Sequence, residues 1–255
     1  MTDASPYDAL AAGYDAVMAH VDYPAWAAYV QSLVRKHHPE AETLVELGCG
    51  TGSLAVALQP QGPPPSGYDY RAFDGSEPML VVAREAARLS GRRVAFAPLR
   101  FGEPVPGAPA DVVVLVYDGL NYLLSIVEVE ALLVSIRDAL APGGIAILDQ
   151  STPANSVNHA DGFHDEGETD AFAYVRTSSY DEDTRLHTTG FELTLADGTV
   201  ASETHVQRAY TLDEVADAIE AVGLAVVAAY DGFGSDAADE TADRVHWVLR
   251  RAMPG

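Results

Sequence analysis

The sequence predicts an α/β protein, with a doubly wound, mainly parallel sheet and a smaller antiparallel sheet inserted late in the chain. Through the first 150 residues, short apolar runs alternate with segments whose apolar residues recur at helical spacing. That alternation favours parallel strands covered by helices on both faces. Between residues 171 and 210 the period changes to two, which is typical of antiparallel strands. The length of 255 residues suits one such domain with a modest insertion.

Prolines and glycines mark the ends of the elements expected in the first half. Pro24 and Pro39 bound the first long helix, because proline is tolerated in a first helical turn and not in a helix interior. Pro78 lies in the first turn of a later helix for the same reason. Segment 59–70 is rich in proline and glycine and predicts an exposed loop. The expected helices cover residues 25–38, 53–58, 76–89 and 127–140, and the expected strands cover 43–47, 71–74, 94–98, 111–117 and 142–150.

The second half begins with three period-two runs separated by the turns DEDT and ADG, which predict an antiparallel meander. These runs cover residues 171–180, 185–195 and 199–210. Thr211 and Glu214 then show the spacing of a capping box, which predicts a helix over 212–223. The chain is expected to close with two strands, over 224–230 and 244–252.

The composition is strongly acidic, with a formal net charge of −23, and Lys36 is the only lysine. Such a charge repels phosphate backbones and anionic lipid, which argues against nucleic acid and membranes as partners. No stretch approaches the length of a membrane span, and the first residues lack the regions of a secretory leader, so we expect a cytoplasmic protein. An acidic surface poor in lysine also suits concentrated salt. A halophilic source is therefore a hypothesis, which thermal stability measured against salt concentration would test.

Three glycines interrupt the apolar run VELGCGTGSLAVAL at 45–58, between an expected strand and an expected helix. Such a turn offers free backbone N–H groups and the positive end of a helix dipole to a polar or anionic ligand. The glycines are Gly48, Gly50 and Gly52, and Ser53 stands where the dinucleotide fingerprint G-x-G-x-x-G has its third glycine. The spacing therefore weakens a nicotinamide-binding interpretation.

Residues 46–52, Glu-Leu-Gly-Cys-Gly-Thr-Gly, resemble the first motif of the class I S-adenosylmethionine (SAM) methyltransferases. Three further segments resemble later motifs of that family, namely FDGSEPML (73–80), DVVVLVYDGLNYL (111–123) and ALAPGGIAILD (139–149). The N-terminal segment 7–30 and the C-terminal part are similar to uncharacterised small bacterial methyltransferases and, more distantly, to sugar N-methyltransferases. The resemblance implies a Rossmann-like sheet of seven strands in the order 3-2-1-4-5-7-6, with the seventh strand antiparallel.

The resemblance also implies where SAM binds. Asp74 would accept hydrogen bonds from both ribose hydroxyls, with Asp69 as a weaker rival, and Glu46 would order the turn and the amino group of SAM. Relatives often carry an Asp near adenine where this chain has Leu99 or Arg100, so backbone groups are the alternative adenine contact. The expected cofactor-binding residues are Glu46, Gly48, Cys49, Gly50, Gly52, Asp74, Gly75, Ser76, Met79, Leu99, Arg100, Tyr117, Asp118 and Asn121.

Proton transfer from the acceptor could involve Tyr14, on an expected N-terminal lid helix, Tyr122, or His159. For an amine acceptor, orientation alone could suffice. His164 is expected, like His159, in a polar loop, whereas His187 and His205 are expected as surface residues of the meander. Cys49 is expected to be a packing residue. The carboxylates near the two loop histidines lack a recognised ligand spacing, so no metal is expected.

The expected function is transfer of a methyl group from SAM to a nitrogen or oxygen of a small-molecule acceptor, with S-adenosylhomocysteine as the product. A nicotinamide-dependent oxidoreductase and a non-catalytic SAM-binding or dimerisation protein are the alternatives. Residues 1–150 and 211–255 would form the SAM-binding core with its N-terminal lid helices. Residues 151–210 would cover the acceptor or make a dimer contact, so both a monomer and a homodimer stay open.

Overall fold

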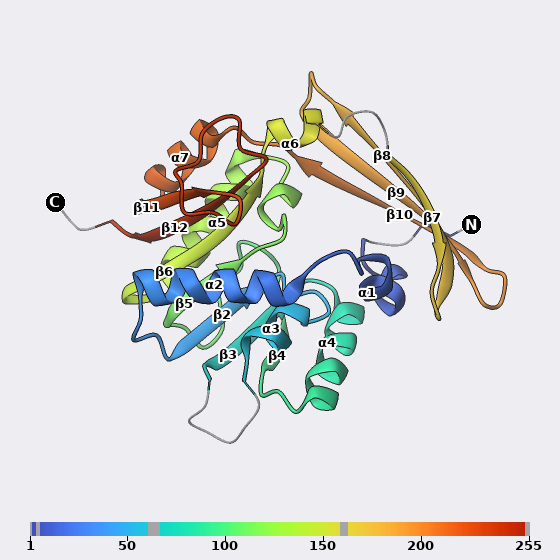
Figure 1. Ribbon diagram of the computed structural model, residues 1–255, viewed down its shortest axis with the longest axis horizontal. Coiled ribbons are helices and arrows are strands. Elements are labelled where there is room, and N and C mark those ends of the chain that lie inside the picture. The colour runs from blue at the N-terminus through green and yellow to red at the C-terminus, as the bar shows by residue number, and fades with distance from the viewer. Residues whose placement is uncertain (1, 4–5, 61–66, 159–162, 253–255) are drawn as a thin grey trace.

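The computed structural model describes residues 2–3, 6–60, 67–158 and 163–252, and its centre is a seven-stranded sheet (Figure 1). The strands are β2 (Thr43–Leu47), β3 (Asp69–Asp74), β4 (Ala95–Pro98), β5 (Ala110–Leu115), β6 (Leu140–Ser151), β11 (Leu224–Asp231) and β12 (Arg244–Arg251). They lie in the order β4-β3-β2-β5-β6-β12-β11, and β12 runs antiparallel to both neighbours. The expected order 3-2-1-4-5-7-6 with an antiparallel last strand is therefore confirmed.

Helices cover both faces of this sheet because successive residues of the buried strands point to opposite sides. Val112 and Val114 of β5 pack toward one set of helices, and Val113 and Leu115 pack toward the other. The first set is α2 (Tyr23–His37), α3 (Ser53–Leu58) and α4 (Glu77–Ser90), and the second is α5 (Ile126–Ala139) and α7 (Leu212–Ala221). Among the described residues, no helix is long and apolar enough to cross a bilayer.

A second, antiparallel sheet projects from one side of this core (Figure 1). It follows the short helix α6 (Pro153–Asn158) and consists of β7 (Phe163–Glu168), β8 (Phe172–Asp181), β9 (Leu186–Leu195) and β10 (Val200–Arg208), with β1 (Thr2–Asp3) parallel to β10. The expected meander corresponds to β8, β9 and β10. The expectation that His164 lies in a polar loop was wrong, because this residue belongs to β7 and pairs with Thr177 of β8. Backbone pairing with β8 overrides the weak strand propensity of the acidic sequence FHDEGE.

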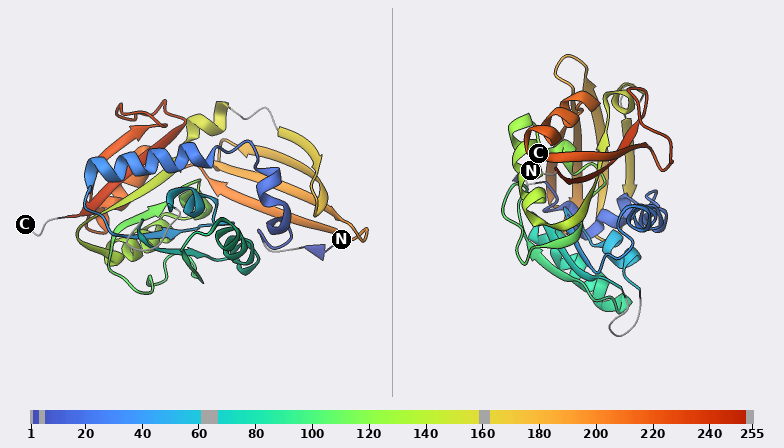
Figure 2. Two further views of the ribbon diagram at one scale, coloured as in Figure 1. Left: turned by 60° about the horizontal axis from the view of Figure 1, so that its bottom comes forward. Right: turned by 90° about the vertical axis from the view of Figure 1, so that its left-hand side faces the viewer.

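The N-terminal segment packs against the second sheet rather than against the core alone (Figure 2). It forms η1 (Leu10–Gly13) and α1 (Tyr14–Val17), and Leu10 lies in one apolar cluster with Phe172 of β8. Gly13 permits the approach, since a Cβ atom there would lie 2.5 Å from the Phe172 ring. Tyr7, with a φ of +68°, lies in a turn before η1.

Asn121 joins the two sheets at the short helix η2 (Leu120–Tyr122). Its side-chain amide donates hydrogen bonds of 2.8 Å to the backbone oxygens of Ser151, at the end of β6, and Arg208, at the end of β10. Its side-chain oxygen accepts a 3.0 Å hydrogen bond from the Ser151 N–H. The side chain is buried and satisfied on three sides, so it fixes η2 between the sheets.

We predict that Asn121→Ala lowers the free energy of unfolding by about 2–3 kcal/mol, because two partly buried carbonyls and one N–H lose this partner. Urea unfolding of the ligand-free protein measures the change. Asn158→Ala is the matched control, since the hydrogen bond from Asn158 to Asp243 is exposed and its loss should change stability by about 0.5 kcal/mol or less. Equal effects from the two variants would contradict the bridging role of Asn121.

Candidate active site

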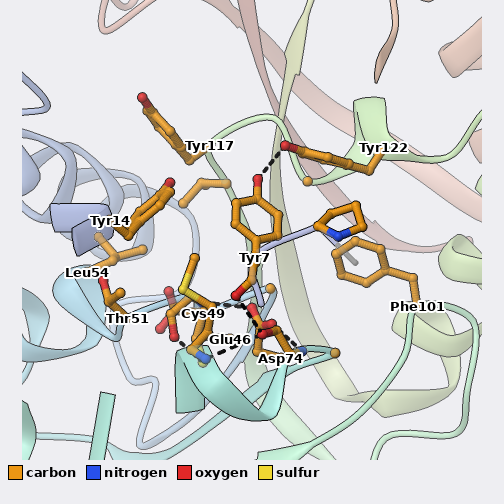
Figure 3. Close-up of a pocket in the computed structure, with 18 of the residues that line it drawn as sticks. Tyr7, Tyr14, Glu46, Cys49, Thr51, Leu54, Asp74, Phe101, Tyr117 and Tyr122 are labelled. Atoms are coloured by element: carbon orange, nitrogen blue, oxygen red, sulfur yellow. Dashed lines mark hydrogen bonds between the residues drawn. The ribbon is translucent and has the colours of Figure 1, made fainter. Parts of the chain in front are cut away.

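A cavity of about 790 Å³ opens at the carboxyl ends of β2, β3 and β5 (Figure 3). Parallel strands end at the same edge of a sheet, so the loops that follow these three strands meet there. The N-terminal segment and the start of α2 complete the wall. The lining residues are Pro6, Tyr7, Asp8, Tyr14, Tyr23, Trp26, Glu46, Gly48, Cys49, Gly50, Thr51, Leu54, Asp74, Gly75, Ser76, Met79, Leu99, Arg100, Phe101, Val116, Tyr117, Gly119 and Tyr122.

The glycine turn forms the floor of the cavity. Gly48, Gly50 and Gly52 have φ values of +66°, +53° and +76°, which L side chains rarely adopt. A Cβ atom on Gly50 would meet no atom within 4 Å, so open space lies directly above this backbone. A Cβ on Gly48 would instead lie 3.1 Å from the Phe101 ring. The bare backbone at Gly50 is therefore a cradle that a side chain would fill and that a ligand can occupy.

Asp74 ends β3 and organises the turns on either side of it. One carboxylate oxygen accepts a 2.8 Å hydrogen bond from the Gly50 N–H, and the other accepts one of 2.8 Å from the Ser76 N–H. Burial raises the pKa of Asp74, while these backbone hydrogen bonds act in the opposite direction. Each oxygen keeps a lone pair for a further donor such as a ligand hydroxyl. Asp69 lies at the amino end of the same strand and does not line the cavity.

Glu46 is a buried carboxyl group inside the cavity wall, with 3% of its surface exposed. The Tyr70 hydroxyl donates a 2.8 Å hydrogen bond to it. Burial raises the pKa of Glu46 to about 8, although the Tyr70 hydrogen bond lowers it, and the neighbouring Asp74 raises it further. A cationic group bound beside Glu46 would restore its charge. The cavity therefore provides a site for a positively charged ligand group.

Tyrosines form the opposite wall. Tyr7, Tyr14, Tyr23, Tyr117 and Tyr122 all line the cavity, and burial raises the pKa of every one of these phenols. They are neutral hydroxyl groups at neutral pH, able both to donate and to accept hydrogen bonds.

The N-terminal segment is fastened to the glycine turn by the residue that follows Tyr14. The Thr51 hydroxyl donates a 2.6 Å hydrogen bond to the Asp15 carboxylate, and the Ser53 hydroxyl donates one of 3.3 Å to the same oxygen. Because Thr51 and Ser53 belong to the turn and to the first residue of α3, α1 and the cavity floor are positioned together. This contact fixes Tyr14 in the cavity wall.

The loop after β5 is held in an uncommon backbone conformation. Tyr117 and Asp118 have φ values of +68° and +64°, which cost free energy in residues other than glycine. Asp118 forms a 2.7 Å ion pair with Arg244 of β12, and its N–H donates to the buried Asp149 carboxylate. Arg244 also contacts Asp149 directly. This buried network turns the Tyr117 side chain toward the cavity.

The structure brings most of the expected site residues together. Lining the cavity are Glu46, Gly48, Cys49, Gly50, Asp74, Gly75, Ser76, Met79, Leu99, Arg100 and Tyr117, with Tyr14 and Tyr122. Gly52, Asp118 and Asn121 do not line it: Gly52 precedes α3 as its N-cap, and the other two hold neighbouring loops in place. His159 lies outside the described residues. Burial raises the pKa of the Cys49 thiol well above its usual value, which suits packing rather than nucleophilic chemistry.

Several lining residues carried no signal of function in the sequence. Tyr23 and Trp26 lie in the first turns of α2, where their spacing indicates only an amphipathic helix. Phe101 follows β4 in a loop without a motif. The expectation that His205 is a surface residue was wrong, since only 4% of it is exposed. Period-two patterning could not show this, because the covering layer comes from the distant N-terminal segment.

Comparison with known proteins agrees with this geometry. The family described as "Methyltransferase domain" matches residues 44–144. A protein of Geobacillus sp. (strain WCH70) with a provisional methyltransferase name is 28% identical over 261 residues, covering 96% of this chain and 99% of that protein. The dTDP-3-amino-3,4,6-trideoxy-α-D-glucopyranose N,N-dimethyltransferase of Streptomyces venezuelae is 29% identical over 131 residues, 50% of each protein.

Solved structures share the fold at low sequence identity. A SAM-dependent methyltransferase from Clostridium acetobutylicum ATCC 824 superposes with a TM-score of 0.80 at 19% identity, covering 97% of this chain and 99% of that one. A SAM-bound amino pentose methyltransferase from Micromonospora echinaspora has a TM-score of 0.69 at 21% identity, covering 93% and 96%.

The sheet order, the glycine cradle and the matched domain together define a Rossmann-like methyltransferase. Residues 44–144 match a methyltransferase domain, and the solved structures that share the fold include SAM-dependent methyltransferases, whose cofactor is SAM. The open space over Gly50, the Asp74 carboxylate and the buried Glu46 suit the ribose and the charged amino acid end of that cofactor. The nicotinamide-dependent alternative finds no support among these relatives.

The raised pKa of Glu46 predicts how stability depends on pH. The folded pKa, about 8, lies above the ordinary value of 4.5, so the protonated carboxyl stabilises the fold fully below pH 4.5. This contribution is lost as the pH rises through about 8. Between pH 6 and pH 9 the free energy of unfolding of the ligand-free protein should fall by about 2–3 kcal/mol. The Glu46→Gln variant should not show this fall.

Urea unfolding at the two pH values measures this difference. The exposed Glu40→Gln is the control for removing one carboxylate. A Glu46→Gln variant with the same pH dependence as the wild type would show that Glu46 is not the buried neutral acid described above.

Proposed function

We propose that the protein transfers the methyl group of SAM to a nitrogen or oxygen atom of a small-molecule acceptor. The observation that carries this proposal is that the glycine cradle and the tyrosine wall line one cavity. One side of that cavity suits SAM, and the other offers neutral hydroxyl groups to a second molecule. SAM supplies an activated methyl group, which forms a bond to the acceptor atom as its bond to sulfur breaks and sulfur keeps the electron pair.

The protein's contribution is then binding and alignment. Asp74 and the Gly50 backbone hold the nucleoside end of the cofactor, Glu46 pairs with its amino group, and Leu99 and Arg100 flank the adenine. Tyr14 and Tyr122 face the acceptor. The second sheet, with the N-terminal segment packed on it, covers the acceptor side.

The charges around the cavity favour a neutral or basic acceptor. The carboxylates of Asp8 and Asp74 line it beside one basic residue, Arg100, so an anionic group inside the cavity would meet unfavourable potential. Two relatives with related sequences are named as amino-sugar N,N-dimethyltransferases, and a neighbouring structure is an amino pentose methyltransferase. An amine on a sugar ring is therefore the first acceptor class to test, and a phenol is the second.

Calorimetric titration with SAM, S-adenosylhomocysteine and NAD tests the cofactor site. We expect micromolar binding of the first two and none of NAD. Asp74→Ala should weaken SAM binding about 30–150-fold, as expected for losing about 2–3 kcal/mol of charge-assisted hydrogen bonds, and Gly50→Val should abolish it by filling the cradle. Asp69→Ala, at the far end of β3, is the matched control. Unchanged binding in the Asp74→Ala and Gly50→Val variants would refute this site.

Turnover is tested with a panel of methyl 3-amino-3-deoxy-α-D-glucopyranoside, benzylamine and catechol, with formation of S-adenosylhomocysteine as the readout. We expect methylation of the amino sugar, and loss of that activity in the double variant Asp74→Ala/Gly50→Val. Full turnover by the double variant would exclude the proposed catalytic site. Tight SAM binding without turnover of amine or phenol would contradict the proposed acceptor class.

A further inference from the structure

A buried hydrogen-bonded chain leads from the tyrosine wall of the cavity into the second sheet. The hydroxyl groups of Tyr7 and Tyr122 are in direct contact, as the dashed line in Figure 3 shows. The Tyr122 hydroxyl lies 3.1 Å from Nδ1 of His205 on β10, and Nε2 of the same imidazole lies 3.2 Å from a carboxylate oxygen of Glu203. We propose that His205, oriented by Glu203, accepts the proton released by the methyl acceptor, through Tyr122 and Tyr7.

The partners of Glu203 fix the direction of each hydrogen bond between Glu203, His205, Tyr122 and Tyr7. Its carboxylate is buried and accepts backbone N–H groups of Tyr7, Ala9 and Leu10 at 2.8, 2.6 and 2.9 Å. Burial raises the pKa of Glu203, but the hydrogen bonds from His205 and from these N–H groups outweigh it and leave the pKa below its usual value. Glu203 is thus an anion, and an anion beside Nε2 requires that Nε2 carries the imidazole proton.

That tautomer leaves the Nδ1 atom of His205 as a hydrogen-bond acceptor. Tyr122 then donates its O–H to Nδ1, and its oxygen receives the O–H of Tyr7. The Tyr7 oxygen keeps its lone pairs for a donor in the cavity, which both tyrosines line. The geometry is that of an acid–histidine pair, extended by two tyrosines to reach the substrate.

The backbone of Tyr7 indicates that its position is enforced. Its φ of +68° is uncommon for a bulky residue and carries a conformational cost. Glu203 holds its N–H, and the Ser76 hydroxyl donates a 3.3 Å hydrogen bond to its carbonyl oxygen. Tyr7 is therefore fixed between the second sheet and the turn after β3, with its hydroxyl on Tyr122. Strained residues held from both sides in this way cluster at functional sites.

The proton transfer balances without another reactant. When the acceptor nitrogen or oxygen forms its bond to the methyl carbon, it loses a proton to the Tyr7 oxygen. The Tyr7 proton passes to Tyr122, and the Tyr122 proton passes to Nδ1 of His205. Both tyrosines end neutral, and the imidazolium that forms lies against the Glu203 carboxylate. Because neither tyrosine need exist as a free phenolate, the raised pKa values of these phenols do not block the path.

The surroundings of His205 contain no other ionisable group in direct contact within the described residues. Glu203 lies on its own strand, Tyr122 faces it from η2, Tyr7 faces it from the N-terminal segment, and Phe191 of β9 packs on the ring at a centroid distance of 5.3 Å. Tyr14 and the carboxylates of Asp74 and Asp118 act on the two tyrosines through their charges.

The first test is nuclear magnetic resonance of protein labelled with ¹⁵N-histidine and saturated with S-adenosylhomocysteine. The His205 signal is assigned by its loss in His205→Gln. We expect the Nε2-protonated tautomer at pH 8, and loss of that preference in Glu203→Gln. A His205 protonated on Nδ1 would overturn the proposal, because that atom could not accept from Tyr122. This result does not depend on which acceptor the enzyme methylates.

The second test is the pH profile of kcat, and it rests on the proposed methyl transfer. With the amino sugar of the panel above, His205→Gln and Tyr122→Phe should each lower kcat about 100-fold at pH 7. Both should leave S-adenosylhomocysteine binding unchanged, which also checks that they fold. The double variant should be no slower than either single variant, since the residues act as one unit. The acid limb of the wild-type profile should disappear in His205→Gln.

His187→Gln is the matched control, because this histidine lies on the neighbouring strand β9 and does not line the cavity. It should keep kcat within about twofold of the wild type. Normal turnover by His205→Gln would overturn the relay while leaving the methyltransferase function intact. Failure of the wild type to bind SAM would instead refute the proposed function, so the two failures are distinguishable.

Discussion

The cavity depends on one carboxylate, that of Asp74, which ties two turns of the chain together. Its two oxygens bind the N–H groups of Gly50 and Ser76, so the turn after β2 and the turn after β3 keep a fixed separation. Parallel pairing of the two strands brings their ends to one edge, but pairing alone does not set the shape of the loops beyond. The carboxylate does so, and it stays available to a ligand hydroxyl.

A second buried carboxylate, Glu203, does for the N-terminal segment what Asp74 does for the turns. Three backbone N–H groups, those of Tyr7, Ala9 and Leu10, converge on it, and apolar packing of Leu10 on Phe172 supports the same placement. This wall of the cavity is therefore built from segments that lie far apart in the sequence, namely the N-terminal segment, η2 and β10. Tyr7 is held at this wall by Glu203 of the second sheet and by Ser76 of the core.

The two buried acids Glu46 and Glu203 differ in the direction of their pKa shifts. Glu46, with one hydroxyl partner, has a raised pKa, whereas Glu203, with an imidazole and three N–H partners, has a lowered one. The difference follows from the number of donors that each desolvated carboxylate receives. One acid can thus respond to a cationic ligand while the other remains a permanent anion that orients His205. A strongly acidic protein obtains two distinct functions from the same chemical group.

The sequence by itself determined the sheet, its helices and the cofactor turn. Apolar periodicity is local, and a motif such as Glu46 to Gly52 keeps all its chemistry within seven consecutive residues. Only the tertiary structure decided the acceptor wall, because Tyr7, Tyr122 and His205 are separated by more than eighty residues at each step. It also showed that Asp118 and Asn121, which were expected to bind the cofactor, do not line the cavity and instead hold neighbouring loops in place. Side-chain direction after a strand depends on partners such as Arg244, which no local pattern specifies.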